Sequence, residues 1–309
     1  MNQTMTMIIA VAAVGCLCFA GGYFVGNSGD SADNTPIFVS GSTTVQPLMG
    51  AWASAYEQNN DVAIYVSGGG SGGGRTATSN GTVNIGMASS PTSVAGITQH
   101  TICFDAVVIV ASSNVSLSNL TINDLKALYM LAGAPAPDTP GLLSMGLEPV
   151  VREFGSGTRE SVVTAFGLPS ESATSRQIGG TERTSTASML SYINSGNDRI
   201  GFVNMNSLAE ISGGTNVIYP NVNSMTVNSI EATAENVQEY MTSGGASGYP
   251  MSRALFILTK DDGSKMDPAT KAFLRWMYSA EAQAIADREG FVHLDPETLK
   301  VEAAKILQL

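Results

Sequence analysis

A short segment of mixed chemistry runs from Arg152 to Thr158, with the order Arg-Glu-Phe-Gly-Ser-Gly-Thr. Its glycines allow successive backbone N–H groups to point into one concavity, its hydroxyls add donors, and the residues that follow have helical character. Arg152 supplies a forked, permanently charged donor. The segment is suited to holding an oxyanion, although a glycine-rich turn beside a surface arginine would have the same composition.

Two earlier segments repeat the order strand, turn and helix. The first joins an apolar strand at 37–39 to a hydroxyl-rich turn at 41–44 and a helix at 47–56. The second joins a strand at 62–66 to a glycine-rich turn at 68–74, and a further strand at 83–87 ends in the hydroxyl-rich turn 88–91. A glycine run is often a flexible linker, but strands flank this one closely, so we interpret its glycines as allowing backbone to approach a ligand. Ligands of open α/β sheets sit at the carboxyl ends of the strands, where all these turns lie.

The segments 41–47, 68–74, 85–89 and 152–158 resemble, in order and spacing, the four ligand segments of the PstS family. These proteins bind phosphate and feed it to phosphate ABC importers, and the resemblance extends from about residue 37 to the end of the chain. It implies an extracytoplasmic solute-binding protein that captures inorganic phosphate between two lobes for an ABC permease and does no chemistry on it. The implied phosphate-binding residues are Ser42, Thr43, Thr44, Ser71, Gly72, Ser89, Arg152, Ser156, Gly157 and Thr158.

The chain departs from the family at Ser89, where many phosphate binders have an aspartate. Such an aspartate accepts the proton of hydrogen phosphate and repels sulfate, whereas serine can donate or accept and does not reject a fully deprotonated anion. Sulfate, or molybdate or tungstate, is therefore an alternative ligand, and so is loss of the ligand in a surface interaction protein. Asp105 and Glu153 could supply an acceptor, but a structural role is favoured for each: Asp105 in a hinge strand and Glu153 paired with a basic neighbour.

The composition agrees with a secreted binder. The 309 residues suffice for two lobes, and 43% hydrophobic with 13% charged residues fits well-buried sheets. The net charge of −11 argues against a nucleic-acid partner. With two histidines and three cysteines there is little material for a metal site, and neither a hydrolase elbow nor a P-loop lysine is present. We therefore expect a monomeric binding protein without cofactor, metal or catalysis.

The amino terminus carries a second signal. Residues 7–25 form an uncharged apolar stretch long enough for a helix to cross the ~30 Å hydrocarbon core of a bilayer. A polar stretch follows it, so we expect a signal or membrane anchor at 1–26 and a tether at 27–35, with the body at the cell surface or in the periplasm. An uncleaved anchor is favoured, a cleaved signal and a lipoprotein modified at Cys16 being the alternatives.

Alternating strands and helices predict an α/β architecture with helices on both faces of the sheet. By resemblance this is a two-lobed periplasmic-binding-protein-like fold of type II, with a hinge of two crossover strands and one hydrophobic helix before it. Lobe I is expected at 36–106 and 251–309, and lobe II at 107–250. Later strands are expected at 104–110, 200–203, 217–219 and 253–259, and helices at 120–129, 187–194, 234–241, 268–289 (in one or two pieces) and from Pro296.

Overall fold

A computed structural model describes residues 35–261 and 266–308. The predicted anchor at 7–25 and most of the predicted tether lie outside these ranges. Within them, no helix has both the length and the apolar character needed to cross a membrane. Residues from Thr35 onward form one compact unit.

Ten strands of the described residues join in a mixed sheet, in the order β2-β1-β3-β10-β4-β8-β6-β7, with β9 paired to β4 and β5. The strands are β1 (Ile37–Gly41), β2 (Ile64–Gly68), β3 (Ile85–Ala88), β4 (Ile97–Ser112), β5 (Asn119–Leu120), β6 (Glu148–Arg152), β7 (Thr181–Arg183), β8 (Arg199–Asn204), β9 (Val222–Val227) and β10 (Ser252–Lys260).

The helices of the described residues lie between and after these strands. They are α1 (Gln46–Glu57), α2 (Gly70–Asn80), α3 (Ile122–Tyr129), η1 (Leu142–Ser144), α4 (Gly157–Ala165), α5 (Thr186–Asn194), η2 (Met205–Glu210), α6 (Ala234–Thr242), α7 (Pro268–Trp276), α8 (Ala280–Arg288) and α9 (Pro296–Leu307). Side-chain caps begin many of them: Asp295, for example, accepts from two N–H groups of α9, and Pro296 follows at the start of that helix.

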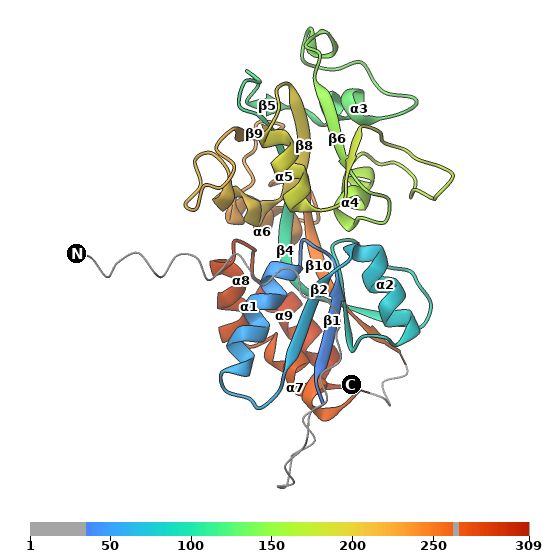
Figure 1. The fold of residues 1–309 in the computed structure, drawn as a ribbon, viewed down its shortest axis with the longest axis vertical. Coiled ribbons are helices and arrows are strands. Elements are labelled where there is room, and N and C mark those ends of the chain that lie inside the picture. Colours follow the sequence, from blue (N-terminus) through green and yellow to red (C-terminus); the bar gives the residue numbers. More distant parts are fainter. Residues whose placement is uncertain (1–34, 262–265, 309) are drawn as a thin grey trace, which may run out of the picture. The chain divides into compact units, whose positions relative to one another are not determined.

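The long strand β4 changes partners along its length. Its residues 97–106 pair with β10, whereas residues 107–112 pair with β8 and β9. The strands therefore fall into two groups joined by β4. The first group is β1, β2, β3, β10 and the first part of β4, in the lower part of Figure 1. The second group is β5 to β9 and the second part of β4, in the upper part of that figure.

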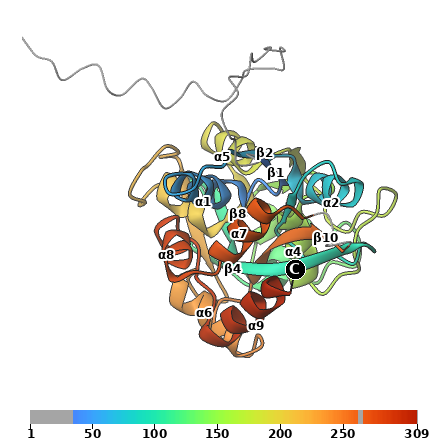
Figure 2. The ribbon, with the colours of Figure 1, turned by 90° about the horizontal axis from the view of Figure 1, so that it is seen from below.

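Helices cover both faces of the first group. Figures 1 and 2 show α1 and α8 on one side of β1 and β2, and α2 on the other. The α1 face is buried because its apolar side chains recur at helical spacing, with Leu48, Trp52 and Tyr56 inside. The Trp52 indole N–H donates to the carbonyl of Ala282 in α8 at 2.7 Å, which fixes the two helices against each other.

Most of the predicted elements are present, and the stretch 268–289 contains two helices, α7 and α8. The predicted strand at 217–219 is wrong. Ile218 is 61% exposed there, and the N–H groups of Ile218 and Tyr219 bind the carbonyl of Glu210 in a loop. The strand of this region is β9, which the sequence analysis missed because polar residues interrupt its apolar pattern.

The glycine-rich run was also assigned incorrectly, because helix α2 begins inside it at Gly70. Glycine weakens helices, so packing must compensate. A Cβ atom on Gly74 would lie 2.5 Å from the carbonyl oxygen of Met87 in β3 and 3.0 Å from the Cα of Gly41 at the end of β1. The helix thus packs against the sheet at a distance that only glycine permits.

Candidate functional site

A small cavity lies where β1, β2, β3 and β6 end. Each strand delivers polar residues to it: Ser42 to Thr44 after β1, Gly70 and Ser71 after β2, Ser89 after β3, and Arg152 at the end of β6. Ser156, Gly157 and Thr158 complete the lining from the start of α4. The cavity is therefore at the carboxyl ends of the strands, where α/β sheets bind ligands.

Nine of the ten predicted site residues line this cavity, and Gly72 does not. The N–H of Gly72 donates to the carbonyl of Gly155 at 2.9 Å, and a Cβ on Gly72 would lie 3.3 Å from that same oxygen. Gly72 thus faces the second group of strands beside the cavity. Gly70 takes its place in the lining with a φ of 75°, in the left-handed region that favours glycine. The sequence analysis placed Gly72 in the site instead of Gly70 because it expected a turn where helix α2 begins.

Three helices direct their amino termini at the cavity region, namely α1, α2 and α4. The first N–H groups of a helix have no partner within it, and the positive end of the helix dipole attracts anions. Among the described residues, no backbone hydrogen bond occupies the N–H groups of Ser71, Gly157 or Thr158. These lining donors are consequently available to an acceptor placed in the cavity.

Hydroxyl groups supply further donors, and one pair of them, Thr44 and Thr158, links the two groups of strands. The Oγ1 atoms of Thr44 and Thr158 are 3.1 Å apart, and the Oγ atoms of Ser71 and Ser89 are 3.3 Å apart. These four side chains are at most 2% exposed. A hydroxyl can rotate from a neighbouring hydroxyl to a bound oxygen, so the pairs can be exchanged for contacts with a ligand.

The charged member of the described lining is Arg152, whose side chain is 2% exposed. Its Nε and Nη2 atoms donate to the carboxylate of Glu153 at 2.8 and 2.9 Å. The same Nη2 also reaches the Thr43 hydroxyl at 3.3 Å, across to the first group of strands. Glu153 is thus paired with a basic neighbour, as expected, and it balances the charge of the arginine beside the cavity.

Asp105 lies in β4 near the point where that strand changes partners, and it is fully buried. Arg253 donates to its carboxylate at 2.7 and 3.0 Å, and the N–H of Met205 donates at 3.0 Å. Burial raises the pKa of Asp105, and the ion pair with Arg253 opposes this shift. Neither Asp105 nor Glu153 belongs to the cavity lining, so neither carboxylate takes the position that Ser89 occupies.

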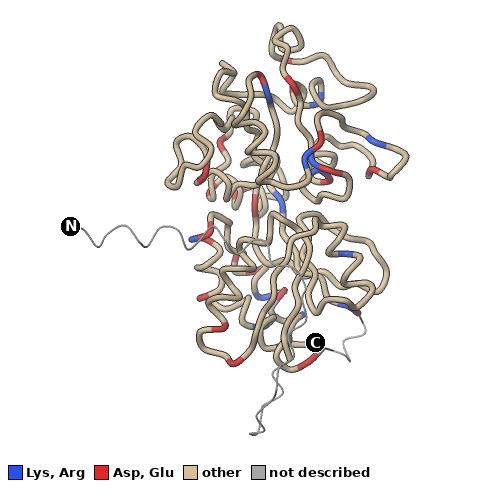
Figure 3. Tube along the Cα trace, in the orientation of Figure 1, with Lys and Arg blue, Asp and Glu red and all other residues tan. Residues whose placement is uncertain are grey.

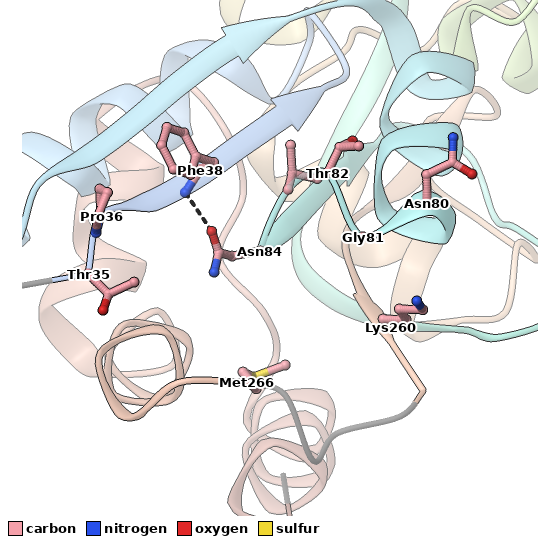
Figure 4. A pocket seen from close by; sticks show the side chains of 10 residues that line it. Thr35, Pro36, Phe38, Asn80, Gly81, Thr82, Asn84, Lys260 and Met266 are labelled. Atoms are coloured by element: carbon pink, nitrogen blue, oxygen red, sulfur yellow. Dashed lines mark hydrogen bonds between the residues drawn. The ribbon is translucent and has the colours of Figure 1, made fainter.

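About 120 Å³ between the lining groups is free of protein atoms, part of it open to solvent, and the gap is too narrow for a water-sized sphere. The lining therefore excludes a large organic ligand, and its two walls must separate to admit a small ion. A larger hollow, of about 1060 Å³ by the same measure, lies at the opposite, amino ends of β1 and β3 (Figure 4). Its lining includes Phe38, Asn84 and Met266. Figure 4 shows the Asn84 side chain accepting from the backbone N–H of Phe38, with Met266 apart from both, whereas the small cavity has converging donors.

Basic residues are scattered over the part of the chain that the structure describes. Figure 3 shows them in both groups of strands, interspersed with acidic positions, and they do not gather along one strip. Capture of nucleic acid needs clustered lysine and arginine. The charge distribution therefore gives no support to a nucleic-acid interface.

A family model described as a PBP superfamily domain matches residues 26–281, and the chain belongs to this family. A curated relative, phosphate-binding protein PstS 2 of Streptococcus agalactiae, is 26% identical over 184 residues. That alignment covers 58% of this chain and 56% of the relative, so the chain matches little more than half of the relative's length.

Solved structures share the fold. One, from Clostridium perfringens, is a putative phosphate ABC transporter substrate-binding protein with bound phosphate; it has a TM-score of 0.67 and 24% identity, covering 84% of this chain and all of that one. Another is an ABC-type phosphate transport receptor from Vibrio cholerae, with a TM-score of 0.59, 24% identity and the same coverage. The family resemblance and the α/β fold predicted from the sequence are thereby confirmed.

Proposed function

We propose that this protein binds inorganic phosphate in the small cavity and delivers it to an ABC permease. The observation that carries the proposal is the convergence of free backbone N–H groups, hydroxyls and Arg152 on one small, narrow space. Together these groups can replace the hydration shell of a tetrahedral oxyanion. The names of the relatives support phosphate as the ligand.

In this proposal nine of the predicted residues contact the anion, and Gly70 joins them. Arg152 supplies positive charge, Ser71, Gly157 and Thr158 supply backbone N–H groups, and the hydroxyls of the lining supply the remaining donors. Gly72 acts indirectly. Its N–H donates to the carbonyl of Gly155, and this hydrogen bond holds α2, which forms part of one cavity wall, against the second group of strands.

The proposed binding movement is closure of two lobes, with lobe I at 36–106 and 251–309 and lobe II at 107–250. The change of partners in β4 between Ala106 and Val107 supports this division. Hydrogen bonds across the cavity, such as that from Arg152 to Thr43, correspond to the closed state. The permease recognises the closed form, and the protein itself catalyses no reaction.

Another tetrahedral oxyanion is the second candidate, and Ser89 is the observation that favours it. Ser89 is 1% exposed and lies in the lining, where it offers a hydroxyl and no carboxylate. A site of this kind accepts sulfate, molybdate or tungstate without facing two unprotonated oxygens toward each other.

Calorimetric titration of the full-length protein with phosphate, sulfate, molybdate and buffer tests both candidates. Saturable heat with phosphate at a stoichiometry of one supports the proposal, and tighter binding of another anion would replace phosphate as the ligand. No heat with any of them would instead favour a surface interaction protein that has kept the fold and lost the ligand.

We also propose that residues 7–25 anchor the protein in the cytoplasmic membrane, with the body outside. The support is the uncharged apolar sequence of this stretch. The native protein should then resist carbonate extraction and retain its encoded terminus. An intact mass lacking the first twenty or so residues would establish cleavage, and a mass with lipid on Cys16 would establish a lipoprotein.

A further inference from the structure

An ion pair connects the two groups of strands beside the cavity. Glu160 in α4 accepts from both terminal nitrogens of Arg75 in α2, at 2.9 and 2.7 Å. The hydroxyl of Ser90 donates to the same carboxylate, and Arg75 also reaches that hydroxyl at 2.5 Å. Arg75 and Ser90 belong to the first group of strands and Glu160 to the second, so these contacts exist only while the groups lie together.

The next residue of α4 makes a parallel contact. The Ser161 hydroxyl donates to the carbonyl of Ser89 at 3.0 Å, and Arg253 approaches that carbonyl and that hydroxyl at 3.4 and 3.3 Å. Consecutive residues of α4 therefore hold two consecutive residues, Ser89 and Ser90, of the opposite group. The first of these, Ser89, lines the cavity.

The same helix also forms one wall of the cavity, through Gly157 and Thr158 in its first turn. A helix of nine residues moves as a unit, since its backbone hydrogen bonds keep the turns in register. An anion that draws the first turn of α4 toward the first group of strands thus brings Glu160 to Arg75 and Ser90. The contacts of the second turn then oppose reopening.

We propose that Glu160, Arg75 and Ser90 form a clasp that holds the closed state and sets the rate at which the bound anion leaves. The inference rests on the proposed function, because it assumes an anion in the cavity. Glu160 is a positioning residue: it lies outside the lining and acts through the Ser89–Ser90 segment. The ion pair is bidentate and partly buried, with the Arg75 side chain 14% and the Glu160 side chain 31% exposed. Such a pair is expected to contribute more to the closed state than a fully exposed pair would.

The test compares Glu160→Gln with Glu148→Gln in the full-length protein. Glu148 pairs with Arg199 at 3.1 Å inside the second group, and those side chains are 20% and 37% exposed for Arg199 and Glu148 respectively. It is therefore a control of similar exposure that spans no interface between the groups. Stopped-flow measurements with phosphate should give a dissociation rate about tenfold faster for Glu160→Gln, or ~1.4 kcal/mol, with the association rate and the Glu148→Gln kinetics nearly unchanged.

Charge exchange adds a readout that a merely structural role would not move. Arg75→Glu and Glu160→Arg should each speed dissociation, and the double variant should recover part of the loss because the opposite charges again face each other. An unchanged dissociation rate in Glu160→Gln, or equal changes in Glu160→Gln and Glu148→Gln, overturns the clasp.

Hydrogen exchange of the ligand-free protein separates this inference from the proposed function. The two groups also come together part of the time without an anion. Glu160→Gln weakens that closed state, so it should raise amide exchange around Ser89 and Ser90 relative to the wild-type protein and to Glu148→Gln. If the wild-type protein binds none of the anions, the proposed function fails and exchange alone decides the clasp. Unaltered exchange at these residues would then overturn it.

Discussion

The two walls of the cavity are built differently. The wall from the first group of strands consists of hydroxyls and glycine backbone, from Ser42 to Thr44, Gly70, Ser71 and Ser89. The wall from the second group contains Arg152 and the capped start of α4, where Ser156 accepts the N–H of Arg159 at 3.4 Å. One wall thus contributes shape and neutral donors, whereas the other contributes a full charge and a helix terminus.

The difference lies in what keeps each wall in place. Helix α2 approaches the sheet through Gly74, and its first turn contacts the other group through Gly72. The second wall depends on local contacts, since Glu153 orients the adjacent Arg152 and Ser156 caps its own helix. In the second wall, loss of charge should therefore weaken phosphate binding most. In the first wall, added side-chain volume should weaken it most.

Arg152→Ala is expected to have the largest effect on binding. It should weaken phosphate affinity by ~2 to 5 kcal/mol, the range for losing one partner of a buried charged contact. Arg199→Ala, in the same group but outside the cavity lining, is the control and should leave affinity within a factor of two. Calorimetric titration measures both, and equal losses would remove the proposed site. Urea unfolding accounts for the unpaired Glu153 left in the variant.

Gly72→Val tests whether the first wall depends on shape. The added side chain would press on the carbonyl of Gly155 and hold the two groups of strands apart. The closed state should then lose ~1 to 3 kcal/mol of stability, as is typical of overpacking. Gly73 is the matched control, because a Cβ there meets nothing within 4 Å and both positions lie in α2. We expect Gly72→Val to weaken phosphate binding at least tenfold relative to Gly73→Val. Equal titrations would mean that the contact with Gly155 has no role in closure.

The two walls also differ in how far they could be predicted from sequence. The residues that the order Arg-x-x-x-Ser-Gly-Thr proposed for the site all lie in the second wall, because they are neighbours along the chain. In the first wall the glycine run was located correctly, but Gly72 was chosen where Gly70 lines the cavity. The packing of α2 on β1 and β3 decides which glycine lines the cavity. This packing joins residues far apart in sequence, so the helix propensities of the individual residues do not reveal it.

Elsewhere in the fold, too, elements with local sequence signals could be predicted and those without them could not. Helix α1, with its apolar periodicity and a proline in its first turn, and α9, with its Asp295 cap, could be predicted. Strand β9, with its interrupted pattern, could not. The cross-group contacts of Glu160 were likewise beyond sequence reasoning, because Arg75 and Glu160 are far apart along the chain and neither lies in a recognisable motif.

Ser89 tests the chemistry of the first wall. With no carboxylate in its described lining, the site lacks the acceptor that would exclude sulfate, a discrimination of ~1 to 3 kcal/mol for an unsatisfied buried group. We expect phosphate binding with weak rejection of sulfate, and a sharper preference in Ser89→Asp. Competition titrations at constant ionic strength measure the ratio, with Ser93→Asp, an exposed position in the same loop and outside the lining, as control. If the natural protein ignores a large excess of sulfate, another acceptor has taken this role.

The smallest effect concerns stability, and it belongs to the first group of strands alone. His100 in β4 is 1% exposed and shares a hydrogen bond with Thr259 in β10 at 3.1 Å. Burial lowers the pKa of His100 below its ordinary value of 6.5, as does Lys305, while Glu302 opposes the shift. The unfolded chain therefore binds a proton near pH 6.5 that the folded chain does not yet accept.

It follows that the free energy of unfolding should fall as the pH drops through 6.5 toward the lowered pKa of His100, by at most one proton, or ~1.4 kcal/mol per pH unit. Urea unfolding of the full-length protein and of His100→Gln at pH 7.5 and 5.5 measures this, and the variant should lose less stability on acidification.

Phosphate affinity, corrected for the ligand's own titration, should change equally in the two proteins, because His100 lies outside the cavity lining. Equal acid sensitivity of the two would show that another group accepts the proton. A selective change in affinity would instead show that the packed interior of the first group is coupled to its wall of the cavity.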